Sequence, residues 1–302
     1  MRPLMAWLLK AAITAGLLTW LFSRPEVRSG LAGLTQLTPG WLVVGFLTAG
    51  LAQAFAAWRW RVCLRTAGVG LPYLSVLRIT LISTGAGYLS IGTLGEDAVR
   101  LTLAAQRCPG QRAALLASVG LDHSSAFPAV VLLWLSVIVA AGGILTVGQG
   151  VWIALGTGLA AFFGVGLALR RFQPDWHRRL RGFLLEAGTR RGFAMAALLS
   201  LPLTLLHYAV FFCAARALGV MVPVVKFCGA AAVADAAASL PISVAGLGVR
   251  EKAFETILGG WHGVPAGQAV ALSLAGLGLI LLWGLAGAVC LLVEPVGRSA
   301  GI

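Results

Sequence analysis

The residues best suited to chemistry lie in two short charged stretches of an otherwise apolar chain. In the first stretch, GTLGEDAVRL, Glu96 and Arg100 are four positions apart, so a helix would place them on one face as an ion pair. Arg100 could then hold a phosphate, while Glu96 and Asp97 meet an amine or a sugar. The alternative is structural, with Asp97 capping a new helix at the membrane surface.

The second stretch is AGLGVRE, in which Arg250 and Glu251 follow two glycines. Gly246 and Gly248 allow the backbone to approach a ligand closely, and a helix that begins there favours an anionic group. Arginine binds phosphate through two parallel hydrogen bonds, which suits a phospholipid headgroup. The alternative is a structural clamp in which Arg250 pairs with Glu251.

Three further titratable residues could take part in binding or proton transfer. Asp235 lies alone in AAAVADAAASL, and a carboxylate in such surroundings must face protein or water, or be protonated. It could couple transport to protons, or it could bond to a neighbouring helix without a transport role. Asp122 and His123 could relay protons, or they could mark a helix start or form a structural pair. His207 has no obvious local partner and is expected to pack beside Tyr208.

No constellation typical of an enzyme or a metal site is present. The sequence lacks G-x-S-x-G, H-E-x-x-H, a Walker lysine and C-x-x-C. The five cysteines are odd in number and lie mostly in or beside apolar runs, which argues against a disulfide framework or a zinc site. We therefore expect no catalytic residues, no metal and no cofactor.

The composition is that of an integral membrane protein. Of the 302 residues, 59% are hydrophobic and 11% are charged, whereas soluble domains carry about 25% charged residues. The net charge of +13 could suggest nucleic acid. Its basic residues fall between apolar runs, however, which is the pattern of membrane orientation. We expect a single all-α polytopic membrane domain over residues 1–302 and no nucleic-acid partner.

Six apolar runs are long enough to span the membrane as helices. The expected spans are Trp7–Phe22, Trp41–Ala57, Phe127–Thr146, Val151–Leu169, Phe193–Cys213 and Ala269–Val293. Arg59, Arg61 and Arg65 are expected to mark the end of the second span. Two more apolar stretches, Tyr73–Leu94 and Val224–Gly248, contain polar residues and glycines, and we predict re-entrant or broken helices there.

The distribution of basic residues predicts the orientation. The segment Arg170–Arg191 carries seven arginines and Arg59–Arg78 carries four, whereas Thr146–Val151 carries none. The positive-inside rule then places both termini and the Arg-rich loops in the cytoplasm. The expected location is a bacterial inner membrane, which the chain crosses several times.

A weak internal repeat joins the two charged stretches. LSIGTLG and LPISVAG stand 151 positions apart, and each is followed within five residues by Arg100 or Arg250. With the predicted topology, residues 1–146 and 151–302 would form halves of opposite orientation. Inverted repeats with broken helices are typical of secondary transporters.

The same stretches resemble a known family of bacterial and archaeal membrane proteins. GTLGEDAVRL and SLPISVAGLGVREKAFETIL are similar to the two signature stretches of the lysylphosphatidylglycerol synthase transmembrane region, also called the flippase-like domain family. RWRVCLRTAG and LDHSSAF fit as well, although His123 stands where the family pattern has arginine. The resemblance implies translocation of a lipid made by a synthase domain. We expect a stand-alone member without that domain.

Residues and resemblance together predict lipid translocation through a polar groove between two halves. The partner would be an anionic or lipid-linked headgroup, with Arg100 and Arg250 contacting phosphate and Glu96, Asp97 and Glu251 orienting them. Two other functions are open: a membrane-embedded transferase acting on a lipid-linked substrate, and an accessory subunit of a separate lipid synthase.

Overall fold

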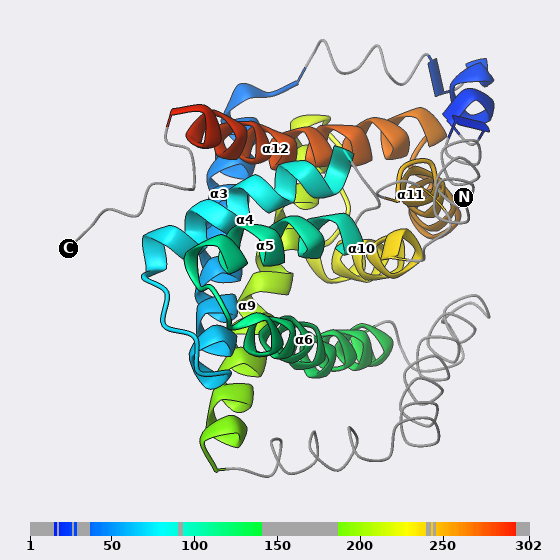
Figure 1. Cartoon of the computed structure of the whole chain (residues 1–302). Helices are drawn as coiled ribbons and strands as arrows, with labels where there is room; N and C mark the ends of the chain where they lie inside the picture. Colours follow the sequence, from blue (N-terminus) through cyan, green and yellow to red (C-terminus); the bar gives the residue numbers. More distant parts are fainter. Residues whose placement is uncertain are drawn as a thin grey trace.

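The fold is a bundle of α-helices, shown by a computed structural model (Figure 1). The structure describes residues 15–16, 18–25, 27–28, 37–89, 93–140, 187–239, 243 and 246–293. No strand occurs among these residues. The main helices are α3 (Pro39–Thr66), α4 (Tyr73–Leu89), α5 (Thr93–Arg107), α6 (Arg112–Ala140), α9 (Ala187–Ala217), α10 (Val224–Ser239), α11 (Val249–His262) and α12 (Ala266–Val293).

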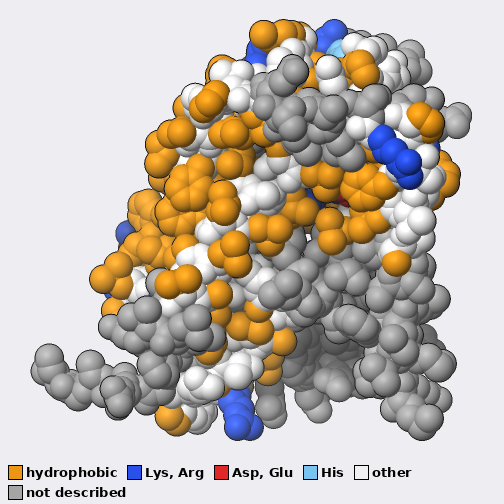
Figure 2. Space-filling model, turned by 90° about the horizontal axis from the view of Figure 1, so that it is seen from above, with side chains coloured by type: hydrophobic (Ala, Val, Ile, Leu, Met, Phe, Trp, Pro, Cys, Tyr) orange, Lys and Arg blue, Asp and Glu red, His pale blue; other side chains and the backbone are white. Residues whose placement is uncertain are grey.

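The described helices confirm an all-α membrane protein. Four of them, α3, α6, α9 and α12, are long and apolar enough to cross a membrane. Hydrophobic side chains cover much of the described surface in Figure 2, and α3 exposes Val43, Leu47 and Leu51. Such a surface is unfavourable in water but is the expected exterior of a protein in lipid.

Four predicted spans correspond to described helices. The second, fifth and sixth spans lie within α3, α9 and α12, and Phe127–Ala140 of the third lies in α6. The fourth span, Val151–Leu169, lies outside the described residues, as do much of the first, Trp7–Phe22, and most of the basic segment Arg170–Arg191. The six-span count therefore stays a prediction.

Helix α3 is longer than the predicted second span. It continues to Thr66, so Arg59, Arg61 and Arg65 lie within it. An unpaired charge in an apolar helix is costly. In the structure Arg59 has a carboxylate partner on α6, which removes most of that cost.

Both stretches predicted to be broken helices are helix–break–helix elements. The first helix, α4, ends at Leu89, and α5 begins at Thr93 and packs against it. The second pair is α10 and α11, with α10 ending at Ser239 and α11 beginning at Val249. Each pair is a helical hairpin, and we call them the first and second hairpin.

The backbone repeats itself at the spacing of 151 residues. After α3, Gly68 adopts a φ of 84° and Pro72 leads into the first hairpin; after α9, Gly219 adopts a φ of 74° and Pro223 leads into the second. Positive φ is a conformation in which glycine has no steric cost, and it ends each long helix in the same way. The hydrogen bonds match too: Val69 N donates to Leu64 O, and 151 residues later Val220 N donates to Ala215 O.

Helices α3 and α9 lie side by side in opposite directions (Figure 1). At one end of the pair, Thr38 N donates to Ala217 O at 3.0 Å. At the other end, Gly192 lies directly against Thr66. Because each hairpin follows the end of one of these helices, the two hairpins start from opposite ends of the pair. Opposite starting ends are what the predicted inverted repeat requires.

The two repeats are interlocked rather than placed side by side. Helix α4 packs on α12, and α10 packs on α6, so each hairpin contacts the last long helix of the other repeat. Glycines permit the first contact, since a Cβ on Gly284 would lie 2.7 Å from the Cα of Gly85. A Cβ on Gly287 would lie 2.4 Å from the carbonyl carbon of Leu81. The helix backbones therefore touch, as small residues allow in membranes.

Candidate functional site

A buried ionic network joins α3, α5 and α6. Asp122, on α6, accepts two hydrogen bonds from Arg59, Nε to Oδ1 at 2.8 Å and Nη2 to Oδ2 at 3.0 Å. Arg100, on α5, donates to Asp122 at 3.1 Å and to Glu96 at 2.8 Å. Asp122 is 2% exposed and Arg100 is 6% exposed. We call Arg59, Glu96, Arg100 and Asp122 the first-hairpin network.

Neighbouring side chains support the network. The Arg100 guanidinium carbon lies 4.9 Å from the centre of a Trp60 ring, a distance that allows a cation–π interaction. Trp60 in turn donates from Nε1 to Ser118 Oγ at 3.3 Å. Arg59 Nη1 donates to Ser200 Oγ of α9 at 3.2 Å, which links the network to the second repeat.

The pair formed by Asp97 and His123 lies at the open edge of this network. Asp97 Oδ2 is 2.7 Å from His123 Nε2, and the side chain of His123 is 55% exposed. The structural alternative for Asp97 is wrong, because α5 begins at Thr93 and Asp97 lies within the helix. The expectation that Asp122 and His123 mark a helix start is also wrong, since α6 begins at Arg112. Their partners on α3 and α5 allow these polar residues to sit in the middle of a long helix.

The second hairpin has a different arrangement around Arg250. Glu251 is fully buried and accepts from Gly248 N at 2.6 Å and from Ser273 Oγ at 2.9 Å. It does not pair with Arg250, so the proposed clamp between these two residues is wrong. Helix α11 begins after Gly248, as expected, and Gly246 and Gly248 have φ of 75° and 81°.

Aromatic and acidic residues surround the side chain of Arg250. Its guanidinium carbon lies 5.6 Å from the centre of the Phe211 ring, and the centroids of the Phe211 and His207 rings are 5.4 Å apart. His207 Nε2 lies 3.4 Å from Asp235 Oδ1, so Asp235 has a partner on the neighbouring helix α9. This contact fits the predicted bond from Asp235 to a neighbouring helix, and a role of Asp235 in transport stays a prediction. We call Asp235, His207, Phe211 and Arg250 the second-hairpin cluster.

The structure thus sorts the predicted residues into two groups. Glu96, Asp97, Arg100, Asp122 and His123 meet at the first hairpin, and Asp235, Gly246, Gly248, Arg250 and Glu251 lie on the second. Sequence reasoning missed Arg59 and Ser273 and found no partner for His207. A helical continuation of α3 beyond Ala57 would have placed Arg59 on a membrane helix in need of a carboxylate. Among the described residues, no group of side chains is arranged to hold a metal ion.

These features define a class of polytopic helical membrane protein built on two broken hairpins with buried charge. The sequence matches the family described as lysylphosphatidylglycerol synthase TM region over residues 7–288. The chain belongs to that family, a membrane domain associated with lipid modification and flippase-like function. A comparison with curated proteins finds no match.

Proposed function

We propose that the protein translocates a lipid across a bacterial inner membrane, with both termini in the cytoplasm. One observation carries the proposal: two hairpins start from opposite ends of the α3–α9 pair, and each has a buried arginine with a buried carboxylate on the hairpin or on the adjoining helix α6. Charges of this kind are expensive at membrane depth and mark pathways for polar solutes. Broken helices in inverted repeats serve this purpose in transporters.

A lipid has both a polar headgroup, which suits the charged residues of the hairpins, and acyl chains, which suit the apolar exterior. The headgroup would follow the polar residues of the hairpins while the acyl chains remain in the bilayer. Fatty chains need no protein cavity, because exposed apolar side chains such as those on α3 already match lipid. Membership of a family associated with lipid modification and flippase-like function also supports a lipid as the transported molecule.

Reconstitution tests this function directly. Purified protein in liposomes with fluorescent headgroup-labelled phosphatidylglycerol should make inner-leaflet label accessible to a membrane-impermeant quencher. Protein-free vesicles and vesicles with heat-denatured protein serve as controls. If a new lipid product forms instead, the protein is a transferase; if neither product nor reorientation occurs with any lipid class tested, translocation by this chain alone is wrong.

A further inference from the structure

The two hairpin arginines occupy equivalent places but have different partners. Trp60 and Phe211 stand 151 positions apart, and each lies against the arginine of the hairpin that follows it. Arg100 is neutralised by Glu96 and Asp122. Arg250, in contrast, forms no ion pair with a described residue, and both its Nε and its Nη1 atoms are buried without a hydrogen-bond partner, whereas Arg100 leaves only Nε without one.

The carboxylates near Arg250 are committed to other groups. One carboxylate oxygen of Glu251 accepts a hydrogen bond from Gly248 N, and the other accepts one from Ser273 Oγ. Asp235 lies against His207, and Arg250 acts on it only through the longer-range field of its charge. Arg250 is 7% exposed, so bulk water has little access to these atoms. Buried polar groups are normally hydrogen-bonded, and the described residues supply no acceptor for these two donors.

A third unpaired donor stands on the segment that leads into α11. Ser243 is 7% exposed, and its Oγ atom has no hydrogen-bond partner. It precedes Arg250 by seven positions, across a turn in which Gly246 and Gly248 take positive φ. The start of α11 adds the partial positive charge of a helix N-terminus. All these groups donate hydrogen bonds or carry positive charge, and an oxyanion is the ligand that accepts from them.

We propose that Arg250 and Ser243 form a binding site for a phosphate group, whereas Arg100 holds the first hairpin in place and binds no ligand. The assignment rests on the proposed function, and it identifies the second hairpin as the place where the headgroup phosphate is held. Arginine suits this role because its planar fork gives two parallel bonds to a phosphate. The same chemistry would accept a free phosphate ion.

Two of the three guanidinium nitrogens of Arg250, Nε and Nη1, are shielded from solvent in this structure, so a phosphate would reach them only after a local rearrangement.

Binding to purified protein in an uncharged detergent tests the site. Isothermal titration would use inorganic phosphate, short-chain dihexanoyl phosphatidylglycerol and, as the uncharged comparison, dihexanoylglycerol. We expect Arg250→Met to weaken binding of the phosphate-bearing probes by about tenfold or more, because it removes charge-assisted hydrogen bonds. Arg250→Lys and Ser243→Ala should each weaken it several-fold. Arg107→Met, the same change at the end of α5, should leave it unchanged.

Melting temperatures show whether a variant has lost phosphate binding or has lost its fold. Loss of an unpaired buried charge should leave the melting temperature of ligand-free Arg250→Met equal to or above that of the parent protein. Equal affinity of the parent and Arg250→Met for every phosphate probe would overturn the site. If Arg250→Met does not fold, equal affinity in both Arg250→Lys and Ser243→Ala would overturn it.

The probes also separate the two sources of phosphate. Arg250-dependent binding of phosphatidylglycerol, with or without inorganic phosphate, supports a lipid headgroup at the site. Arg250-dependent binding of inorganic phosphate alone supports the anion site but contradicts lipid translocation. Arg250-dependent lipid binding with no reorientation in liposomes likewise leaves the site standing while the proposed function fails.

Discussion

Trp60 and Phe211 hold equivalent positions in the two repeats, each with its ring against the arginine of the following hairpin. The charged residues around these two arginines, however, differ. Around Trp60, a carboxylate from α6 neutralises two arginines, whereas no described carboxylate pairs with the arginine beside Phe211. The two halves thus share a backbone pattern, but their two arginines have different partners.

Asp122 should be the most important single residue for the stability of the first repeat. Asp122→Asn would leave Arg59 and Arg100 buried with only Glu96 as a charged partner, and we expect a loss of about 3–5 kcal/mol in the free energy of unfolding. Asp97→Asn is the matched control, and because its partner His123 is largely exposed its cost should stay below about 1 kcal/mol. Equal losses in the two variants, measured by denaturant unfolding in detergent, would contradict the network.

Close contact between α4 and α12 can be tested with two glycines of α12. Gly287→Ala would drive a methyl group into the backbone at Leu81, and we expect a loss of about 1–3 kcal/mol. Gly278 has nothing within 4 Å of an added Cβ, so Gly278→Ala should be neutral or slightly stabilising. Thermal melting of both variants would show the difference, and a Gly287→Ala protein as stable as Gly278→Ala would contradict the contact.

The inverted arrangement predicts opposite sidedness for two exposed positions. Gln111 lies between α5 and α6, and Gly260 lies near the end of α11, so they belong to opposite ends of the α3–α9 pair. Single cysteines introduced at these positions, in a background without the five native cysteines, should react with an impermeant maleimide from opposite sides of the membrane. Labelling of both from the same side would contradict an inverted repeat in the membrane.

The predicted role of Asp235 in coupling transport to a proton gradient can be tested by substitution. Asp235 and His207 form a titratable pair that is only partly buried. If translocation depends on a pH gradient, Asp235→Asn should abolish that dependence in liposomes while the protein remains folded by thermal melting. A variant that keeps the full gradient dependence would exclude Asp235 from coupling.

The contact between the N-terminal segment and α11 should weaken in acid. Burial opposes ionisation of Glu255, but hydrogen bonds from Arg24 and Lys252 hold the pKa of its carboxyl below the ordinary value of 4.5. The stabilisation is therefore complete above about pH 4.5 and is lost as the pH falls through the lowered pKa. Melting temperatures should fall less on acidification in Glu255→Gln than in the parent. Equal falls would show that the contact contributes no pH-dependent stability.

Local features of the chain could be predicted from the sequence, because they depend on neighbours along it. The ion pair of Glu96 and Arg100 follows from a spacing of four on a helix, and it is present at 2.8 Å. The breaks between α4 and α5 and between α10 and α11 follow from glycine, proline and polar residues in apolar stretches. The all-α fold class followed from the long apolar runs, and the family followed from the two signature stretches.

Partners that depend on packing could not be predicted. The bond between Arg59 and Asp122 joins residues 63 positions apart, and nothing in the sequence indicates that α3 and α6 bring them together. Glu251 was expected to pair with the adjacent Arg250, but neighbours along a helix point in different directions. The turn at Gly248 instead directs a backbone N–H at Glu251, and α12 supplies Ser273.

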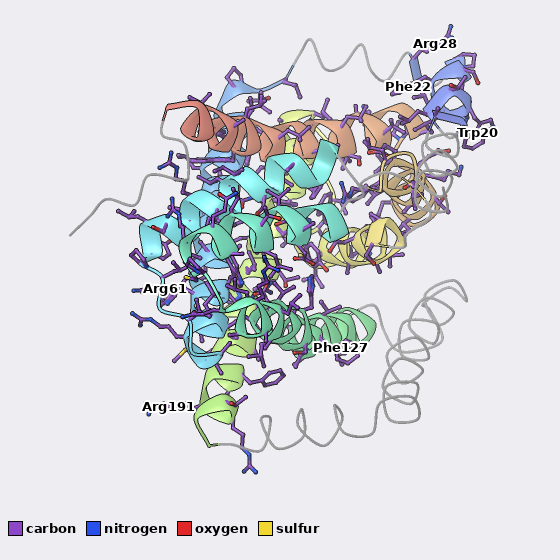
Figure 3. All side chains as sticks on the ribbon, in the orientation of Figure 1. Trp20, Phe22, Arg28, Arg61, Phe127 and Arg191 are labelled. Atoms are coloured by element: carbon purple, nitrogen blue, oxygen red, sulfur yellow. The ribbon has the colours of Figure 1, made fainter. Side chains whose placement is uncertain are left out.

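The way each hairpin packs on the far repeat has a consequence for how the protein can be taken apart. With α4 seated on α12 and α10 on α6, neither half can be lifted away without stripping the other of its neighbours. In Figure 3, Arg61 of α3 and Arg191 of α9, which belong to different repeats, lie toward the same end of the molecule, away from Trp20 and Arg28. Each half nevertheless has most of a hydrophobic core of its own, since Ala196 is the one described second-half residue in the buried cluster around Trp60 and Ala49 is the one described first-half residue in the buried cluster around Phe227. Separation of the halves would therefore expose the helix faces that now meet, and unfolding of one half should lower the stability of the other.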